Sequence, residues 1–274
     1  MTIPFHCDTN HSLKRTMIIS IVNHKGGTGK TTTSINLGSS LAEAGYRVVL
    51  VDLDAQGSLT YSLGIDDRSP TIADAFHGDA TVHQLITERE GMAILPAGAG
   101  LADVELAIAK ADERFNHLST LLQELPDYDF VLIDCPPSLS LLTLNALAAS
   151  DYILVPMQMD VLALRGLDSM LETVRKVNAI HPRLTVLGIV PVMVDTRKNM
   201  HQEILKYIQS NYTEHVFTQV IHTSVKAAEA PSFGKSVVAY APQSTTAIDY
   251  RALAKEVVRM TKKNQQQRPI TIND

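Results

Sequence analysis

A cluster of glycine, lysine and threonine near the start of the chain has the residue types that bind a phosphate. It reads His24-Lys25-Gly26-Gly27-Thr28-Gly29-Lys30-Thr31-Thr32. Closely spaced glycines let successive backbone N–H groups converge on one anion, and a helix that begins there adds the positive end of its dipole. Lys30 can reach the outer phosphates of a nucleotide, and the Thr31 hydroxyl can bind Mg²⁺. The segment predicts a phosphate-binding loop rather than a glycine-rich hairpin that happens to contain two lysines.

Three carboxylates stand where apolar runs end. Asp52 and Asp54 lie at and just beyond the end of the run 47–52, and Asp134 directly follows the run 130–133. Carboxylates at the carboxyl ends of parallel strands point into the crevice where open α/β sheets bind ligands. An apolar strand that ends in Asp is also the Walker B arrangement, in which the carboxylate holds Mg²⁺ through water. Taken alone, each is an ordinary acidic turn, but together with the loop they indicate nucleotide hydrolysis.

Strand-like and helical stretches alternate along the chain and must position these residues. Apolar runs of strand length occupy residues 17–22, 47–52, 92–95, 130–133, 152–155 and 184–190. Helical patterns occupy residues 31–44, 101–124, 140–149, 163–180, 199–210 and 245–262, and Gly45 is expected to end the first helix. Most of the apolar runs are continuous, as in strands covered on both faces. We therefore predict a doubly wound α/β fold with a mainly parallel sheet and helices on both faces.

The loop K-G-G-x-G-K-T resembles the deviant Walker A loop of the ParA/MinD group of ATPases. The resemblance extends from about residue 17 to 260 and implies an ATPase that uses Mg²⁺ and dimerises around ATP. In that group the additional lysine, here Lys25, crosses the dimer to the partner's phosphates. The resemblance gives catalytic roles to Lys25, Lys30 and Asp54, the last by orienting the attacking water, and a supporting role to Asp52. It implies ATP contacts from Lys25, Gly26, Gly27, Thr28, Gly29, Lys30, Thr31 and Thr32, and Mg²⁺ contacts from Thr31, Asp54 and Asp134.

Three further segments favour the ParA/Soj branch of this group. They are Pro136 to Ala146, the P-x-Q-x-D stretch from Pro156 to Asp160 followed by A-L-R-G-L, and the E-A-P-S-x-G-K-like stretch from Glu229 to Lys235. This branch implies non-specific DNA binding by the ATP dimer, a ParB-like activator and a chromosome, plasmid or protein cluster as cargo. The DNA contacts expected are Arg197, Lys226, Lys235 and Arg251. Thr223 and Lys226 stand where many family members have arginine.

Two other functions remain open. A MinD-like membrane-associated ATPase needs a C-terminal amphipathic helix with an apolar and a basic face, and residues 261–274 contain little apolar material. An amidoligase or synthetase of the same superfamily would use ATP to activate a small substrate. Its ATPase activity would depend on a metabolite and not on DNA.

Composition sets the remaining limits. The 274 residues are 45% hydrophobic and 19% charged, with a net charge of -5, which argues against a protein that coats DNA by bulk charge. Two separate cysteines, Cys7 and Cys135, suit a reducing compartment. There is no apolar run of roughly 18 residues and no secretory signal pattern.

We expect a cytoplasmic, nucleoid-associated protein with one domain over residues 17–262 and flexible tails at 1–16 and 263–274.

Overall fold

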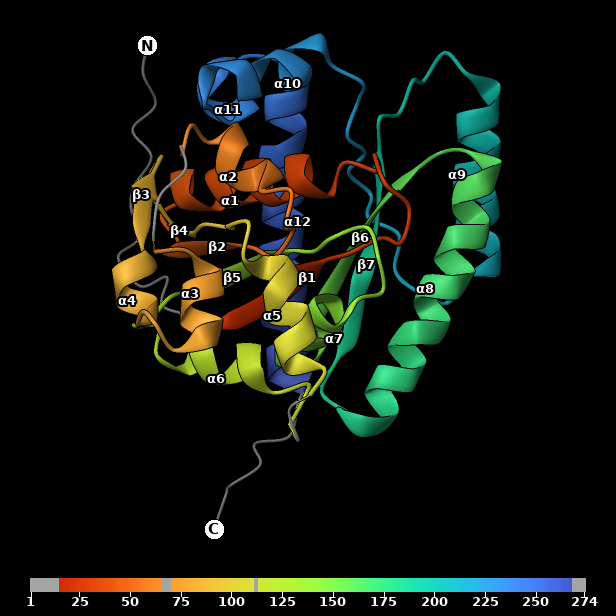
Figure 1. Ribbon diagram of the computed structural model, residues 1–274. Helices are drawn as coiled ribbons and strands as arrows, with labels where there is room; N and C mark the ends of the chain where they lie inside the picture. The colour runs from red at the N-terminus through yellow and green to blue at the C-terminus, as the bar shows by residue number, and fades with distance from the viewer. Residues whose placement is uncertain (1–14, 66–69, 111–112, 268–274) are drawn as a thin grey trace.

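The computed structural model describes residues 15–65, 70–110 and 113–267. Its centre is a seven-stranded sheet in the order β3-β4-β2-β5-β1-β6-β7 (Figure 1). Neighbouring strands are parallel except β3 and β4, which are antiparallel. The strands are β1 (Met17–Ile21), β2 (Val48–Asp52), β3 (Thr87–Arg89), β4 (Met92–Leu95), β5 (Phe130–Asp134), β6 (Tyr152–Gln158) and β7 (Thr185–Val192).

Burial explains why the apolar runs form strands. Every residue of β2, β4 and β5 is buried, because helices cover both faces of the sheet. All six predicted strands are present. The sequence analysis missed β3, which is short and polar and pairs only with β4 at the edge of the sheet.

Helices form a layer on each face of the sheet (Figure 1). One layer contains α1 (Lys30–Glu43), α2 (Ser58–Ser62), α10 (Val225–Glu229), the 3₁₀ turn η1 (Ala230–Phe233), α11 (Val237–Tyr240) and α12 (Thr245–Gln267). The other contains α3 (Ile72–His77), α4 (Val82–Leu85), α5 (Leu101–Ile108), α6 (His117–Gln123), α7 (Leu141–Ala149), α8 (Val161–Ile180) and α9 (Asn199–Asn211). This arrangement confirms the predicted doubly wound α/β fold.

The largest differences from the predicted helices are at 101–124 and at the end of the last helix. The helical pattern at 101–124 forms two separate helices, α5 and α6. The last helix, α12, continues to Gln267, five residues beyond the predicted end at 262. Leu253 and Val257 of α12 are fully buried against the core. Across the described ranges, we find no helix with both the length and the apolar character needed to cross a membrane.

The helix that follows the glycine-rich loop lies unusually close to the sheet. Gly38, in the middle of α1, faces Leu50 of β2, and a Cβ atom added at Gly38 would lie 2.7 Å from Leu50 Cδ2 and 3.0 Å from Met92 Sδ. Gly45 takes the left-handed conformation (φ +90°) and its N–H donates to the Ala42 carbonyl, which ends the helix as predicted. A residue without a side chain at position 38 therefore sets the distance between α1 and the sheet.

We expect Gly38→Ala to be less stable than Gly166→Ala by about 1–3 kcal/mol, the usual cost of overpacking a core. Both glycines lie inside helices, so both substitutions gain the same helix propensity. At Gly166 the added methyl group has an ordinary contact, 4.0 Å from Asn23 Oδ1. Denaturant unfolding of the two variants measures the difference, and equal stabilities would contradict the close packing.

Candidate nucleotide-binding site

The loop between β1 and α1 forms a concave array of backbone N–H groups. Gly27 (φ +72°) and Gly29 (φ +77°) take the left-handed conformation that glycine adopts readily. Within the described part of the chain, the backbone N–H groups from Gly26 to Thr32 donate to no acceptor. Successive unpaired N–H groups at the start of a helix form a site for phosphate oxygens. The geometry suits the phosphate-binding role predicted for residues 26–32.

Lys30 is buried beneath this loop. Its Nζ donates to the Lys25 carbonyl at 3.3 Å, and the Thr28 hydroxyl donates to the same carbonyl, also at 3.3 Å. Burial lowers the pKa of Lys30, and the negative charge of Asp134 opposes that shift. The ammonium group therefore lies within the loop, close to the N–H groups that would face a phosphate.

Lys25 points away from the loop and toward α8. Its Nζ donates to Asp160 Oδ2 at 2.9 Å, and both side chains are about one-third exposed. Asp160 also caps α8, because its Oδ1 accepts a hydrogen bond from Ala163 N at 2.8 Å. Partial burial raises the pKa of Asp160, but the hydrogen bonds from Lys25 and Ala163 outweigh burial and hold it below its usual range. The lysine that was predicted to act across a dimer is thus paired within its own chain.

Asp134 lies at the end of β5 and contacts the first turn of α1. Its Oδ2 accepts a hydrogen bond from the Thr31 hydroxyl at 2.7 Å, and its Oδ1 accepts one from the Ser34 hydroxyl at 2.9 Å. The structure therefore brings together two of the three predicted Mg²⁺ ligands. The sequence analysis missed Ser34, although it lies three residues after Thr31 and so on the same face of the helix.

Asp52 lies beside Asp134, because the two residues are paired in the register of β2 and β5. Its carboxylate accepts hydrogen bonds from Thr60 N at 2.9 Å, from the Thr60 hydroxyl at 2.7 Å and from Asp54 N at 3.2 Å. These bonds shape the turn that leads into α2. Asp54 itself is half-buried and accepts from Gln56 N at 3.0 Å, and it makes no hydrogen bond to Thr31 or Asp134 among the residues described.

The two adjacent carboxyl groups are electrostatically costly without a cation. Burial raises the pKa of both Asp52 and Asp134, and the neighbouring Asp52 raises that of Asp134 further. The described residues contain no group of three or more His, Cys, Asp or Glu arranged to hold a metal by themselves. A hydroxyl and carboxylates are nevertheless the hard oxygen ligands that Mg²⁺ prefers, and Mg²⁺ is often bound by one or two of these together with phosphate oxygens. The donor set fits such a shared site.

Cys135 takes no part in this chemistry. It is buried directly after Asp134, and burial raises the pKa of its thiol. A buried, protonated thiol is a poor nucleophile. Cys135 packs in the core instead, and Cys7 lies outside the described residues.

Two of the predicted DNA contacts are exposed but paired with acidic neighbours. Arg197 forms a two-point pair with Asp195, with distances of 2.9 Å from Nε to Oδ1 and 2.9 Å from Nη2 to Oδ2. Its side chain is 88% exposed. Lys226 donates to Glu229 Oε2 at 2.9 Å, and its Nζ lies 5.6 Å from the centre of the Tyr240 ring.

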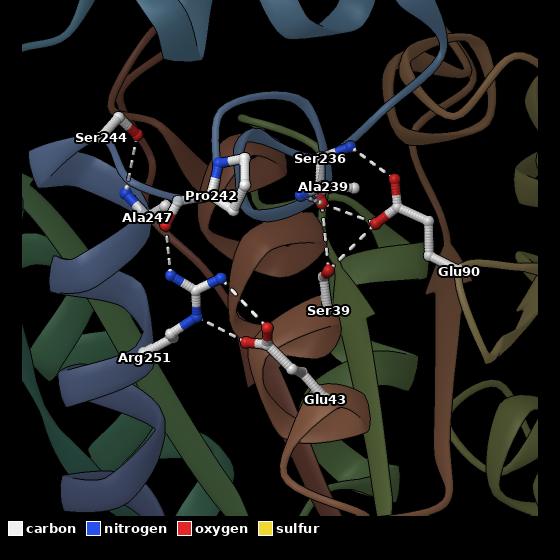
Figure 2. Close-up of polar contacts among 9 residues, drawn as sticks. All are labelled: Ser39, Glu43, Glu90, Ser236, Ala239, Pro242, Ser244, Ala247 and Arg251. Atoms are coloured by element: carbon white, nitrogen blue, oxygen red, sulfur yellow. Dashed lines mark hydrogen bonds and ion pairs between the residues drawn. The ribbon is translucent and has the colours of Figure 1, made fainter. Parts of the chain in front are cut away.

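Lys235 and Arg251 differ in accessibility. Lys235 is exposed and lines a small cleft together with Thr31 and Thr32. Arg251, in contrast, joins α12 to α1: its guanidinium makes a two-point pair with Glu43 and donates to the Pro242 carbonyl, as Figure 2 shows. Only 27% of the Arg251 side chain is exposed. This geometry does not support the predicted DNA contact of Arg251 and gives the residue a structural role.

The same junction contains a second polar cluster (Figure 2). Glu90, in the turn between β3 and β4, accepts hydrogen bonds from Ser236 N at 2.9 Å, from the Ser236 hydroxyl at 2.6 Å and from the Ser39 hydroxyl at 3.0 Å. Glu90 has a left-handed backbone (φ +48°), which is uncommon for a residue with a side chain. The cluster ties α1, α11 and the sheet edge together, and so holds the helix that begins at the loop.

The raised pKa values predict a pH-dependent stability. A carboxyl group whose pKa is raised by folding favours the folded state at low pH, and this contribution is lost as the pH rises through the folded-state pKa. We therefore expect the contribution of the Asp52–Asp134 pair to the stability of the nucleotide-free protein in EDTA to be lost from about pH 4 toward neutral pH, while carboxyl groups with lowered pKa values, such as Asp160, act in the opposite direction. Asp134→Asn removes part of that loss, so its thermal midpoint relative to wild type should be higher at about pH 8 than at about pH 5.

The control for this prediction is Asp127→Asn, which changes an exposed carboxylate in the turn before β5. Its midpoint relative to wild type should be the same at both pH values. If the midpoint of Asp134→Asn relative to wild type were also the same at both pH values, ionisation of the Asp134 carboxyl group would not destabilise the fold.

Comparison with known proteins agrees with this site. A family model described as an AAA domain matches residues 16–186. The chromosome partitioning protein ParA of Caulobacter vibrioides is 39% identical over 249 residues, which cover 88% of this chain and 93% of the relative. The sporulation initiation inhibitor protein Soj of Bacillus subtilis is 42% identical over 246 residues, which cover 88% of this chain and 97% of the relative.

A solved structure is also similar. A cobyrinic acid a,c-diamide synthase from Mycobacterium smegmatis with bound ADP and magnesium superposes with a TM-score of 0.81 at 36% identity, covering 91% of this chain and 96% of that one. The residues that the family model matches include the glycine-rich loop and the strands that carry Asp52 and Asp134. The chain belongs to the ParA/Soj family of partition ATPases.

Proposed function

We propose that this protein binds ATP and Mg²⁺ at the loop between β1 and α1, dimerises around the nucleotide, and in that state holds DNA so that a cargo is positioned or segregated. The observation that carries this proposal is the array of unpaired N–H groups from Gly26 to Thr32 beside the Thr31–Asp134 pair. Family membership and the solved structure with ADP and magnesium support the same site.

The residues of the site have distinct tasks in this proposal. The N–H groups of the loop and Lys30 bind the phosphates and offset their charge. Thr31 and Asp134 would hold Mg²⁺, which when bound would supply positive charge to offset that of the phosphate oxygens. Asp54, half-buried beyond the end of β2, orients the attacking water from the turn that Asp52 shapes.

In this proposal, Lys25 is the residue that links nucleotide binding to dimerisation. Paired with Asp160, it is withheld from the phosphates of its own chain. An ATP-bound partner provides a more negative acceptor, because triphosphate oxygens carry more charge than one carboxylate. Transfer of Lys25 to that partner completes both active sites together, since a two-fold interface makes the same contact twice.

DNA binding would come from exposed cations. Arg197, Lys226 and Lys235 are the candidates: the Arg197 and Lys226 side chains are 88% and 53% exposed, although Asp195, the partner of Arg197, is only 18% exposed. DNA phosphates would have to replace Asp195 and Glu229 as acceptors, and phosphate oxygens accept charge-assisted hydrogen bonds from both kinds of cation. A ParB-like activator would then stimulate hydrolysis and release the DNA.

A second candidate function is a small-molecule synthetase. It is favoured by the similarity to a solved structure of a cobyrinic acid a,c-diamide synthase. The ATPase rate separates the two candidates: stimulation by a corrinoid acid with glutamine or ammonia would favour the synthetase, and stimulation by DNA with an activator would favour the partition ATPase.

We expect wild-type protein to bind non-specific DNA with ATP and Mg²⁺ and to lose this binding with Lys30→Ala, because binding requires the nucleotide dimer. Fluorescence anisotropy across a salt series measures the effect. Arg197→Ala should lower the slope of log affinity against log salt by about one, as expected for one lost phosphate contact. Arg175→Ala, which changes an exposed arginine of α8, is the matched control. Absence of ATP-dependent binding by the wild type at low salt would contradict the partition proposal.

We expect Lys25→Ala to bind ADP as the wild type does but to lose ATP-dependent dimerisation and stimulated hydrolysis. The physical reason is that the ammonium group contacts Asp160 within the monomer and is needed only across the dimer. Calorimetry with ADP and light scattering with ATP measure the two properties. Lys176→Ala, on the exposed face of α8, should leave both unchanged. A Lys25→Ala variant that still dimerises would remove the proposed role.

A further inference from the structure

Gln158 has no role in the site described so far, although it lies against the phosphate-binding loop. It is the last residue of β6, and its Nε2 donates to the Gly27 carbonyl at 3.0 Å. The same nitrogen lies 2.9 Å from Met193 Sδ. Both partners are acceptors, which fixes the orientation of the amide group. Gln158 therefore bridges the loop and the end of β7.

The bond to Gly27 determines the direction of the next N–H group. A peptide unit is planar and trans, so its C=O and N–H point in opposite directions. With the Gly27 carbonyl directed at Gln158, the N–H of Thr28 points to the opposite side of the peptide. That N–H has no acceptor among the described residues and belongs to the array that would face the phosphates.

An external hydrogen bond matters at Gly27 because the residue itself restrains its backbone little. It has no side chain, its backbone is left-handed, and no atom outside its immediate neighbours lies within 4 Å of an added Cβ. Glycine also has more accessible backbone conformations than any other residue. The hydrogen bond from the Gln158 amide to the Gly27 carbonyl therefore restrains the peptide that follows Gly27.

Met193 forms the other side of the bridge. It follows the last residue of β7 and has a left-handed backbone (φ +53°), a strained conformation for a residue with a side chain. A Cβ added at Gly29 would lie 3.6 Å from Met193 Cε, so the thioether covers the second left-handed glycine of the loop. Gln158 and Met193 together contact both of these glycines.

A second set of hydrogen bonds connects the end of β6 to the start of the loop. Asn23 is buried, its Nδ2 donates to the Pro156 carbonyl at 2.8 Å, and its Oδ1 accepts from Lys25 N at 3.0 Å. Asn23 therefore fixes where the loop leaves β1, and Gln158 fixes the orientation of its central peptide.

We propose that Gln158 is a positioning residue for nucleotide binding, which holds the Gly27–Thr28 peptide so that the Thr28 N–H faces the phosphates. Met193 supports it by accepting from the same amide and covering Gly29. Gln158 acts through the backbone and does not touch the reacting atoms. This inference rests on the proposed nucleotide site, and it identifies Gln158 as the side chain that sets the geometry of the loop there.

The test compares Gln158→Leu, which keeps the size of the side chain but has no donor, with wild type. Calorimetric titration with ADP and Mg²⁺ should show roughly two- to tenfold weaker binding, the usual effect of one lost hydrogen bond. Because Gln158 is half-buried at the surface, thermal unfolding of the nucleotide-free protein should be unchanged. Gln202→Ala, which removes an exposed amide that donates to the Thr196 carbonyl, is the control and should change neither value.

Gln158→Glu supplies a readout that a purely structural role would not produce. At about pH 8 its carboxylate has no proton to donate and repels the Gly27 carbonyl, so ADP binding relative to wild type should be weaker than in Gln158→Leu. At about pH 4 roughly two thirds of the side chain is protonated and can donate again, so binding relative to wild type at the same pH should partly recover.

Three results would overturn the inference. They are ADP binding by Gln158→Leu equal to wild type, a loss of affinity matched by a loss of thermal stability in the nucleotide-free protein, and no recovery of Gln158→Glu at low pH. A wild-type protein that binds neither ADP nor ATP would instead overturn the proposed function itself, which keeps the two failures distinguishable.

Discussion

A run of backbone N–H groups without internal acceptors is the constraint on which this structure depends. Such groups are tolerated only where they face solvent or a ligand, so these N–H groups add nothing to the stability of the free loop. Besides the side-chain bonds to the Lys25 carbonyl, the shape of the loop depends on its neighbours. The strand order supplies them, because β1 lies between β5 and β6. Asp134 reaches the first turn of α1 from one side, and Asn23, Gln158 and Asp160 connect the loop to the other.

How far the sequence predicts this arrangement depends on whether the signal is local. The buried strands were predictable because each is a continuous apolar run. Thr31 and Asp134 were predictable because each belongs to a motif whose chemistry requires that residue type. The edge strand β3 and the short helices α2, α3, α4, α10 and α11 were not predictable, because three to six residues carry too little periodicity. Ser34 and Gln158 were missed for another reason: their partners, Asp134 and Gly27, lie about one hundred residues or more away along the chain.

Arg251 illustrates the same limit for charged residues. A lysine or arginine in a helix gives no sign in the sequence of whether it faces solvent or a carboxylate. Glu43 lies 208 residues from Arg251 in the sequence, yet the two join α1 to α12 (Figure 2). The net charge of -5 likewise does not show which charged side chains are free to bind a partner. Several cations of the chain are already paired with its own carboxylates, so the number of basic residues overstates the positive charge that is offered to DNA.

Asp160 has two partners of different kinds, and this has a consequence for any change at Lys25. A buried carboxylate that loses its only cation is left with an uncompensated charge, which makes such a pair difficult to break. Asp160 is instead one-third exposed and stays bonded to the Ala163 N–H at the positive end of α8. In the proposed transfer of Lys25 to a partner, the dipole of a twenty-residue helix would remain to stabilise the negative charge of Asp160. Breaking the Lys25–Asp160 pair would then cost less than breaking a fully buried pair, which suits a reversible contact.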